Sequence, residues 1–415
     1  MNISQKELDK WLSTYSIRLK AVFRDNVSKR SIENLVRHIS DEYEYSGWYI
    51  TGGEGFLCLV YSIVLDSYEI WKFPNEKILE SQTKINRFFR GFIIQRKLHQ
   101  KIGFGVPGMY FAKLCPSMVS MEAINGKSLV NYIQEQSTKN NIKMFCLICV
   151  LMTKIHTCQV IHRDIKPENI LVAEDESCSD STMVRLKPVI VDYGLAKRID
   201  GQDDNLTGIG AEMGSFFYSP PEQVGHAADA ADADYLNDVF SLTVLLYTIL
   251  VIKEKPVPRN TKDISQLDPE NDLPPEYLPI FKAGTAARER RYQNVPQLLR
   301  AVMKASGFSS NEDWLEKGVI ETRKHSDVGA VMSQEKRDSF YGLESDEEHI
   351  SDEEDEEIES QIKSALTYNG LEKKMRYSMP LSELLEGMEE SKKKFITGMV
   401  STVRVVDQMG ANHYD

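Results

Sequence analysis

The spacing of apolar residues divides the first third of the chain into helical and extended segments. Residues 1–45 carry apolar side chains at mostly helical spacing, so we expect an N-terminal helical extension whose second helix covers 28–40. From 46 to 73, aromatic and β-branched residues alternate around glycines and an Asp-Ser turn, which predicts three antiparallel strands. A helix is expected over 75–102, and two short strands over 106–125.

The rest of the chain reads as mainly helical from 126 to about 305, with interruptions near 160–172 and 184–223. Residues 238–252 are apolar nearly all round, which predicts a helix buried in a core. The pattern therefore predicts an α+β protein with a small β-rich lobe, a larger helical lobe and helical extensions at both ends.

Two further segments follow the helical lobe. Residues 307–379 read as a linker, and 380–408 place apolar residues along one face of a long amphipathic helix. We expect this C-terminal helix to pack on the rest of the chain, to dimerise, or to make an autoinhibitory contact.

The net charge of −12 comes almost entirely from one tract. Residues 344–359 hold eleven acidic side chains and no Lys or Arg, which leaves −12 + 11 = −1 for the rest of the 415 residues. We expect the tract to be disordered. The near-neutral remainder argues against a nucleic-acid partner. Ser345 and Ser351 each precede Asp-Glu-Glu, which suits acid-directed kinases such as casein kinase 2, although a solvated spacer is the preferred interpretation.

The number of cysteines and the lengths of the apolar runs indicate in which cellular compartment the protein is expected. Six cysteines are too few for a disulfide scaffold, and the pair Cys146 and Cys149 lies in an apolar helical run that predicts a core helix. The first residues lack the pattern of a signal peptide, and the longest apolar runs, 144–152 and 244–252, are too short for a membrane span. We expect a soluble, cytoplasmic protein, with delivery as a secreted effector into a host cytosol left open.

The segment "VIHRDIKPENILV", residues 160–172, places five ionisable groups and an Asn between two apolar runs. A buried core does not tolerate such groups unpaired, because each costs several kcal/mol. A plain surface loop would not need the apolar flanks. The pattern therefore predicts a loop held between two short strands, with its polar groups directed into a site.

Three separate features accompany this loop. In "GGEGFLCLV", Gly53 and Gly55 with Val60 fit a glycine loop that lets backbone amides approach phosphates, although glycine-rich hairpins are common. Lys72 is a lone Lys in an apolar strand, which also describes an edge residue. In "VIVDYG", Asp192 follows a buried strand, where it could cap a turn or bind a metal.

Together these motifs resemble the eukaryotic-type, or Hanks-type, serine/threonine protein kinases across residues 46–306. The resemblance implies a bilobal protein-kinase fold with an N-lobe over 46–122 and a C-lobe over 126–306. It implies transfer of the γ-phosphoryl group of ATP to Ser or Thr hydroxyls of a protein substrate, and autophosphorylation. ATP and Mg²⁺, or Mn²⁺ in its place, are the cofactors implied.

The resemblance also assigns chemical roles. Asp164 would accept or orient the proton of the attacking hydroxyl, and Lys166 would steady the transferring phosphoryl group. Asn169 and Asp192 would hold the metal ion, because Mg²⁺ prefers oxygen ligands. Lys72 would bind the α- and β-phosphates.

The adenine pocket follows from the same comparison. Met121 would be the gatekeeper, and the backbone of Glu122 and Ile124 would bind the adenine. Val60 would lie above the ring and Leu171 below it.

Structural or regulatory roles fall on a further set of residues: His162, Arg163, Thr207, Ser215, Glu222, Asp238 and Arg291. Glu222 would pair with Arg291, and Asp238 would anchor the backbone of the catalytic loop. Arg163 would pair with a phosphorylated activation loop, with Thr207 as the best phosphosite. Ser215 would contact the catalytic Asp and Lys, and His162 would pack rather than act as a base.

The chain departs from the family at three positions. The helix after the Lys strand should carry a Glu that holds this Lys, but no acidic residue occurs between Glu80 and Glu122, and the expected position falls near Gly91. Ile70 replaces a small Ala and should narrow the adenine slot. Cys58 stands where the last loop glycine is expected.

Two other functions compete with the kinase hypothesis. A pseudokinase scaffold that binds nucleotide or a partner is favoured by the missing Glu, and disfavoured by the joint presence of Lys72, Asp164, Asn169 and Asp192. A small-molecule kinase of the aminoglycoside type is disfavoured by Lys166 and by the Pro-Pro-Glu segment.

Overall fold

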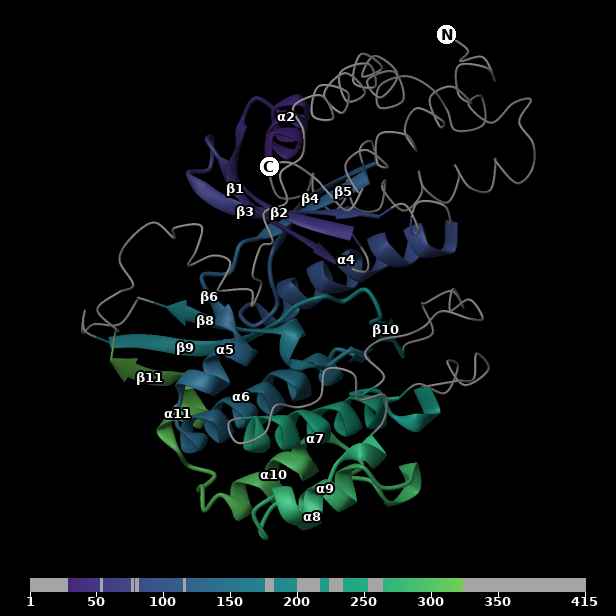
Figure 1. Ribbon diagram of the computed structural model, residues 1–415, viewed down its shortest axis with the longest axis vertical. Helices are drawn as coiled ribbons and strands as arrows, with labels where there is room; N and C mark the ends of the chain where they lie inside the picture. The colour runs from purple at the N-terminus through teal and green to yellow at the C-terminus, as the bar shows by residue number, and fades with distance from the viewer. Residues whose placement is uncertain are drawn as a thin grey trace. The chain divides into compact units, whose positions relative to one another are not determined.

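The computed structural model describes residues 29–52, 55–75, 78, 82–114, 117–175, 183–199, 217–223, 234–252 and 264–323 (Figure 1). These residues fall into two compact units. The first holds the described residues up to Ile93 together with 108–123, and the second holds 94–107 and the described residues from 124 onward. The acidic tract and the predicted C-terminal helix lie outside the described residues.

The first unit is built on a five-stranded antiparallel sheet with the order β1-β2-β3-β5-β4. Its elements are α2 (Lys29–Ile39), β1 (Tyr43–Gly52), β2 (Gly55–Ser62), β3 (Ser67–Pro74), β4 (Met109–Leu114) and β5 (Ser117–Glu122). The predicted strands and the helix over 28–40 are confirmed. The first strand begins at Tyr43, three residues before the expected start of the N-lobe, because its aromatic residues continue the alternating pattern backward.

Alternation along the strands gives this sheet two different faces. Helix α2 lies along one of them (Figure 1) and buries Ile32, Leu35 and Val36 against it. The strand residues in the same cluster are Phe56, Cys58, Val60, Trp71, Phe73 and Met118. The other face carries Lys72 and the residues opposite it.

The second unit is mainly helical. Its helices are α5 (Leu129–Glu135), α6 (Thr138–Thr157), α7 (Tyr235–Val251), α8 (Pro269–Asp272), α9 (Leu278–Gly284), α10 (Val295–Ala305) and α11 (Asp313–Lys317), and α4 (Gln82–Ile102) contributes its second half. Side chains of Ser128, Ser137 and Asn294 cap the first turns of α5, α6 and α10. Among the described helices, none has the length and apolar character needed to cross a membrane.

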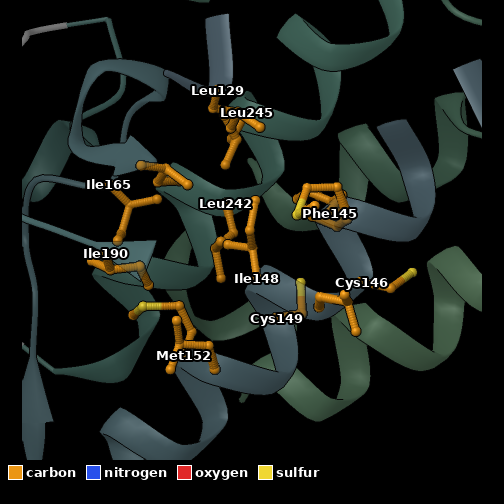
Figure 2. Close-up of a cluster of buried hydrophobic side chains, with 14 of the residues drawn as sticks. Leu129, Phe145, Cys146, Ile148, Cys149, Met152, Ile165, Ile190, Leu242 and Leu245 are labelled. Atoms are coloured by element: carbon orange, nitrogen blue, oxygen red, sulfur yellow. The ribbon is translucent and has the colours of Figure 1, made fainter. Parts of the chain in front are cut away.

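Helices α6 and α7 form the centre of this unit. Figure 2 shows side chains of α6, among them Phe145 and Ile148, facing Leu242 and Leu245 of α7. The helix predicted over 238–252 is confirmed, and it is buried on nearly every side. Cys146 and Cys149 are buried in α6, as predicted. Burial raises the pKa of the Cys146 thiol to about 12. Such a thiol stays protonated at neutral pH.

Strands of the second unit form two small sheets. A four-stranded sheet has the order β11-β9-β8-β6, and β7 pairs with β10. The strands are β6 (Gly126–Ser128), β7 (Val160–Ile161), β8 (Ile170–Asp175), β9 (Met183–Ile190), β10 (Lys197–Arg198) and β11 (Ile320–Arg323). Strands β7 and β8 bracket the polar loop, as the apolar flanks predicted.

The predicted C-lobe limit at residue 306 is too early. Helix α11 buries Trp314 in the core of the second unit, and Ile320 of β11 pairs with Leu186 of β9. Both elements belong to the segment predicted as linker. They are five and four residues long, too short for a periodic pattern to show.

Candidate active site

The polar loop of residues 162–169 is held at both ends. Strand β7 ends at Ile161, and a single 3-10 turn, Pro167–Asn169, leads directly into β8 at Ile170. Proline at the start of this turn presets its backbone angle. The side chain of Ile165 is fully buried in the core beneath the loop. The apolar residues therefore fix a loop whose other side chains are polar.

Asp238, in the first turn of α7, anchors this loop from below. Its carboxylate accepts the backbone N–H of His162 at 2.9 Å and of Arg163 at 2.8 Å. It also contacts Nε2 of His156 at 2.8 Å. Burial alone would raise the pKa of Asp238, but the bond and charge of His156 and the bonds from the loop lower it below its usual value. A buried anion thus fixes the backbone directly before Asp164.

Sequence reasoning missed His156. It lies in the last turn of α6, 82 residues before Asp238, and only packing of α6 on α7 brings the two together. A histidine near a helix C-terminus is common, so no local pattern distinguishes it.

The carboxylate of Asp164 is oriented by two neighbours in the loop. Nδ2 of Asn169 donates to Oδ2 of Asp164 at 2.7 Å and to its backbone carbonyl at 2.9 Å. Nζ of Lys166 lies 2.9 Å from the same Oδ2. Asp164 is 9% exposed and Asn169 is 6% exposed. Three residues predicted to act together are therefore in direct contact.

His162 uses both ring nitrogens inside the protein. Nδ1 accepts the backbone N–H of Asp164 at 3.3 Å, so Nε2 carries the proton and donates to the Val191 carbonyl at 3.2 Å. The ring packs edge-on against Tyr193, and burial lowers the pKa of His162. A neutral imidazole with both nitrogens occupied has the packing role predicted for it.

The oxygen atoms suited to Mg²⁺ lie on Asn169 and Asp192. The amide nitrogen of Asn169 is used by Asp164, which leaves Oδ1 as its metal-binding atom. The N–H of Val191 bonds to the Asn169 carbonyl at 3.0 Å, so Asp192 follows directly. Asp192 has a left-handed φ of 64°, which orients it off the end of β9.

This donor set fits Mg²⁺. Within the described ranges, no cluster of three or more His, Cys, Asp or Glu residues could hold a metal by itself. Mg²⁺ in phosphoryl-transfer sites commonly takes one or two protein oxygens and completes its shell with phosphate and water. One carboxylate and one amide oxygen satisfy that requirement.

In the first unit, Lys72 lies on β3 with 9% exposure. Its Nζ is 6.0 Å from the ring centroid of Phe88 and 5.8 Å from that of Phe92, both on α4. These distances permit cation–π attraction. Helix α4 contains no Asp or Glu, and Gly91, near the position where the family's Glu was expected, is buried in it. Glu80 lies outside the described residues.

The strand register corrects the position assigned to Val60. Directly opposed residues share a face of the sheet. Val60 lies opposite Glu69 and packs in the α2 cluster, whereas Leu57 lies opposite Lys72. The prediction that Val60 covers the adenine is therefore wrong, and Leu57 has the orientation for that role. Cys58 lies in the same cluster with α2.

Gly55 is required by the hairpin itself. A Cβ at this position would lie 1.8 Å from the carbonyl oxygen of Phe73. The residue also has a φ of +152°, which favours glycine. Gly53 lies outside the described residues. Glycine at position 55 is thus explained by strand packing, with or without a phosphate nearby.

Two of the residues predicted to contact adenine lie on β5. Met121 of β5 lies opposite Ile70 of β3, on the face that carries Lys72. The N–H of Glu122 donates to the Gly108 carbonyl at 2.9 Å. The backbone atom of Glu122 that could bind adenine is therefore its carbonyl oxygen.

Two other predicted adenine contacts lie in the second unit. Leu171 is buried in β8 opposite Ser128. Ile124 is half-buried.

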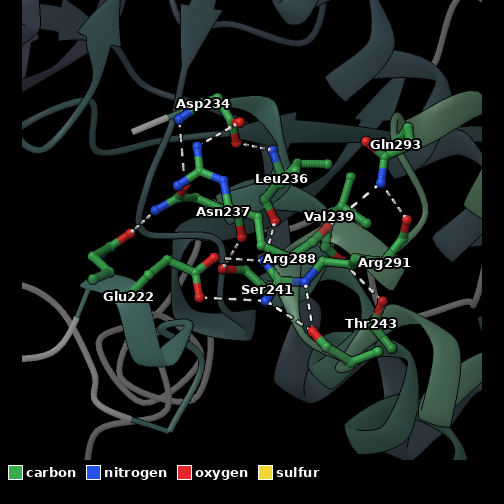
Figure 3. Close-up of polar contacts among 12 residues, drawn as sticks. Glu222, Asp234, Leu236, Asn237, Val239, Ser241, Thr243, Arg288, Arg291 and Gln293 are labelled. Carbon is green, nitrogen blue, oxygen red and sulfur yellow. Dashed lines mark hydrogen bonds and ion pairs between the residues drawn. The ribbon is translucent and has the colours of Figure 1, made fainter. Parts of the chain in front are cut away.

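The Pro-Pro-Glu segment is anchored as predicted. Arg291 donates from Nη1 to Glu222 at 2.7 Å and to the Leu236 carbonyl at 3.0 Å, and its guanidinium lies 5.0 Å from the ring centroid of Phe240. Figure 3 shows this ion pair beside α7. Thr207 and Ser215 lie outside the described residues.

Comparison with known proteins also indicates a protein kinase domain. A model described as "Protein kinase domain" matches residues 109–304, just under half of the chain. Serine/threonine-protein kinase pkn3 of Myxococcus xanthus is 25% identical over 223 residues, covering 52% of this chain and 39% of that protein. Serine/threonine-protein kinase A of Synechocystis is 30% identical over 140 residues, covering 31% and 25%.

A probable serine/threonine-protein kinase of Clostridium perfringens is 28% identical over 203 residues, covering 44% of this chain and 26% of that protein. The matched region thus spans well under half the length of each of these relatives. With the antiparallel sheet, the helical second unit and the loop geometry, these similarities identify the fold. The chain contains a protein kinase domain and is related to the bacterial Hanks-type serine/threonine kinases.

Proposed function

We propose that this protein transfers the γ-phosphoryl group of ATP to Ser or Thr hydroxyls of protein substrates, itself included. The observation that carries the proposal is the mutual contact of Asp164, Lys166 and Asn169 beside Asp192. A purely structural role does not require these four side chains together. Phosphoryl transfer does, because positioning and charge stabilisation supply most of its catalysis.

In this reaction the substrate hydroxyl attacks the γ-phosphorus in line with the departing β–γ bridging oxygen. A new P–O bond forms, the bridging bond breaks, and ADP leaves. Asp164 orients the hydroxyl and takes its proton. Lys166, 2.9 Å from that carboxylate, neutralises charge on the transferring phosphoryl group.

The remaining side chains bind the nucleotide. Asn169 Oδ1 and the carboxylate of Asp192 would hold Mg²⁺, which neutralises phosphate charge when bound. Lys72 would bind the α- and β-phosphates. Leu57 and Leu171 would contact the two faces of the adenine, and the backbone of Glu122 and Ile124 its edge. We place this activity in the cytoplasm.

The test is γ-labelled ATP turnover by the full chain on a basic protein and on itself, beside Asp164→Asn and Asp192→Asn. We expect label on Ser and Thr, and a loss of about 100-fold or more in each variant, because each removes a group at the reacting centre. Label on neither residue type in the wild type would refute the proposal.

A pseudokinase is the second candidate, and α4 supplies its specific support, since this helix offers Lys72 no carboxylate. Nucleotide affinity without turnover in the same experiment would favour it. Calorimetric titration of Mg-ATP measures the binding, and the label assay measures the turnover. A kinase shows both, whereas a nucleotide-binding pseudokinase shows binding alone.

A further inference from the structure

Gln223 makes a bridge that the family resemblance does not account for. It ends the 3-10 turn Pro221–Gln223, directly after Glu222. Its Nε2 donates to the backbone carbonyl of Arg163 at 2.9 Å, and its Oε1 accepts from Nδ2 of Asn237 at 3.1 Å. Both ends of one half-buried amide are thus used, one by the catalytic loop and one by α7.

The carbonyl that Gln223 binds belongs to the peptide unit leading into Asp164. The N–H of that same unit bonds to Nδ1 of His162 at 3.3 Å. Arg163 itself has a left-handed φ of 69°, a costly conformation for a residue with a long side chain. Its own N–H is held by Asp238 at 2.8 Å. Gln223 therefore supplies one of the contacts that keep the strained unit in place.

The chemistry of this contact requires an amide. A backbone carbonyl needs a donor, which glutamine offers at Nε2 while its Oε1 accepts from Asn237. A Glu would place an anionic acceptor against the carbonyl and would lose the bond. An apolar side chain of the same length would fill the space and leave the carbonyl without this donor.

We propose that Gln223 is a positioning residue that couples the end of the activation segment to the catalytic carboxylate of Asp164. The ion pair between Glu222 and Arg291 fixes the position of the turn at 221–223. Through its hydrogen bond to the Arg163 carbonyl, Gln223 then fixes the peptide that precedes Asp164. Correct placement of the substrate-binding segment then supports correct placement of the base. This inference rests on the proposed kinase function.

The variant for the test is Gln223→Met, which keeps length and removes the donor. Asn141→Leu is the control, because Asn141 also donates a side-chain amide to a carbonyl, but to that of Ile133 in α5, at 2.9 Å, rather than to one of the catalytic loop. Two quantities are measured on the full chain: kcat and KM for ATP, and amide hydrogen exchange of residues 160–170 by mass spectrometry.

We expect Gln223→Met to lower kcat by about 10-fold with KM for ATP within twofold, because a small displacement of a catalytic group is costly. Exchange in 160–170 should rise. Asn141→Leu should lower the melting temperature and leave both quantities unchanged. If Gln223→Met does not fold, Gln223→Glu serves, because it keeps the size of the side chain and also removes the donor.

Unchanged exchange in the Gln223 variant, or raised exchange with wild-type kcat, would overturn the positioning role. Equal losses of kcat in Asn141→Leu would also overturn it, as they would reveal a general loss of stability. If the wild type transfers no phosphate while exchange still rises in the Gln223 variant, the kinase proposal fails and the structural coupling stands.

Discussion

At the scale of single residues, the catalytic loop places buried ionisable groups in mutual contact. Asp238 holds two backbone N–H groups and His156, and Asp164 holds Lys166 and Asn169. A buried carboxylate without such partners would cost several kcal/mol. The bonds that orient the reacting group are therefore the same ones that make its burial tolerable.

Asp238→Asn is expected to destabilise the protein in a pH-dependent way. Because the folded-state pKa of Asp238 is lowered, its stabilising contribution is present above the unfolded value of about 3.9 and is lost as pH falls through the folded value. The difference in melting temperature between wild type and variant should be largest near pH 7 and shrink below about pH 4. Thermal unfolding across pH 3–7 measures it, and a constant difference would contradict the assignment.

Phe92→Leu should weaken the hold of α4 on Lys72. Losing the ring face removes a cation–π contact worth about 0.5–2 kcal/mol, so we expect kcat/KM for ATP to fall by roughly 2- to 30-fold. Phe92→Tyr, which keeps the ring, should retain most activity. Phe89→Leu is the control, because Phe89 is also buried in α4 and its ring packs edge-on against Phe88. Equal losses in both Leu variants would show that only packing matters.

Glu80→Gln separates this contact from an ion pair. Glu80 is the acidic residue nearest to α4 on its N-terminal side in the sequence. If Glu80→Gln lowers kcat/KM for ATP more than Phe92→Leu does, a carboxylate rather than the aromatic pair holds Lys72. Steady-state kinetics at several ATP concentrations decides between them.

At the scale of elements, strand β3 separates two environments. Lys72 and Ile70 face one side, while Glu69, Trp71 and Phe73 face the α2 side. Glu69 is fully buried there and accepts hydrogen bonds from Ser120, from Trp71 at 3.3 Å and from Tyr43 at 3.3 Å.

These bonds tie β3 to β1 and β5. Burial raises the pKa of Glu69 more than the three bonds lower it. A carboxyl group with a raised pKa penalises folding once it must ionise.

Glu69→Gln should therefore become relatively more stabilising as pH rises. Both folded and unfolded wild type are protonated at Glu69 below about pH 4, where no ionisation penalty exists. The penalty grows as pH passes the unfolded value and is complete above the raised folded value. The difference obtained by subtracting the melting temperature of the wild type from that of the variant should therefore rise between pH 4 and pH 7. A difference that falls over this range would show that the ionised carboxylate stabilises the sheet.

At the scale of the whole molecule, the second unit includes α11 and β11, so it extends past residue 306 to at least residue 323. A chain ending at 323 keeps both elements and is the reference. One ending at 306 loses Trp314 from the core and β11 from the edge of β9. Burial of a large aromatic side chain is worth about 3–5 kcal/mol, so its melting temperature should be lower by roughly 6–20 °C. Equal melting temperatures would place the limit at 306.

The family similarity is distributed unevenly over the two units. The matched region begins at Met109, so it includes the catalytic loop and Asp192 but excludes α2, β1, β2, β3 and α4. The excluded part holds Lys72 and helix α4, which contains no Asp or Glu. The chemistry of phosphoryl transfer is therefore supported most strongly by the second unit, and the pseudokinase alternative concerns the first.

The sequence by itself determined the local features of this protein. Strand and helix periods, the "HRDIKPEN" loop and its contacts over a few residues follow from neighbours in the chain, because local geometry and short hydrogen bonds depend on nearby residue types. The resemblance to protein kinases, and with it the expected roles of Asp164, Lys166 and Asn169, followed from that motif.

Tertiary structure alone decided contacts between distant segments. His156 meets Asp238 across 82 residues and Gln223 meets Arg163 across 60, so no local pattern could reveal either pair. It also decided the face of Val60, because a shift of one residue in register reverses every side chain of a strand. The orientation of the catalytic loop thus depends on packing between α6, α7 and the turn at 221–223, which forms only when the chain folds.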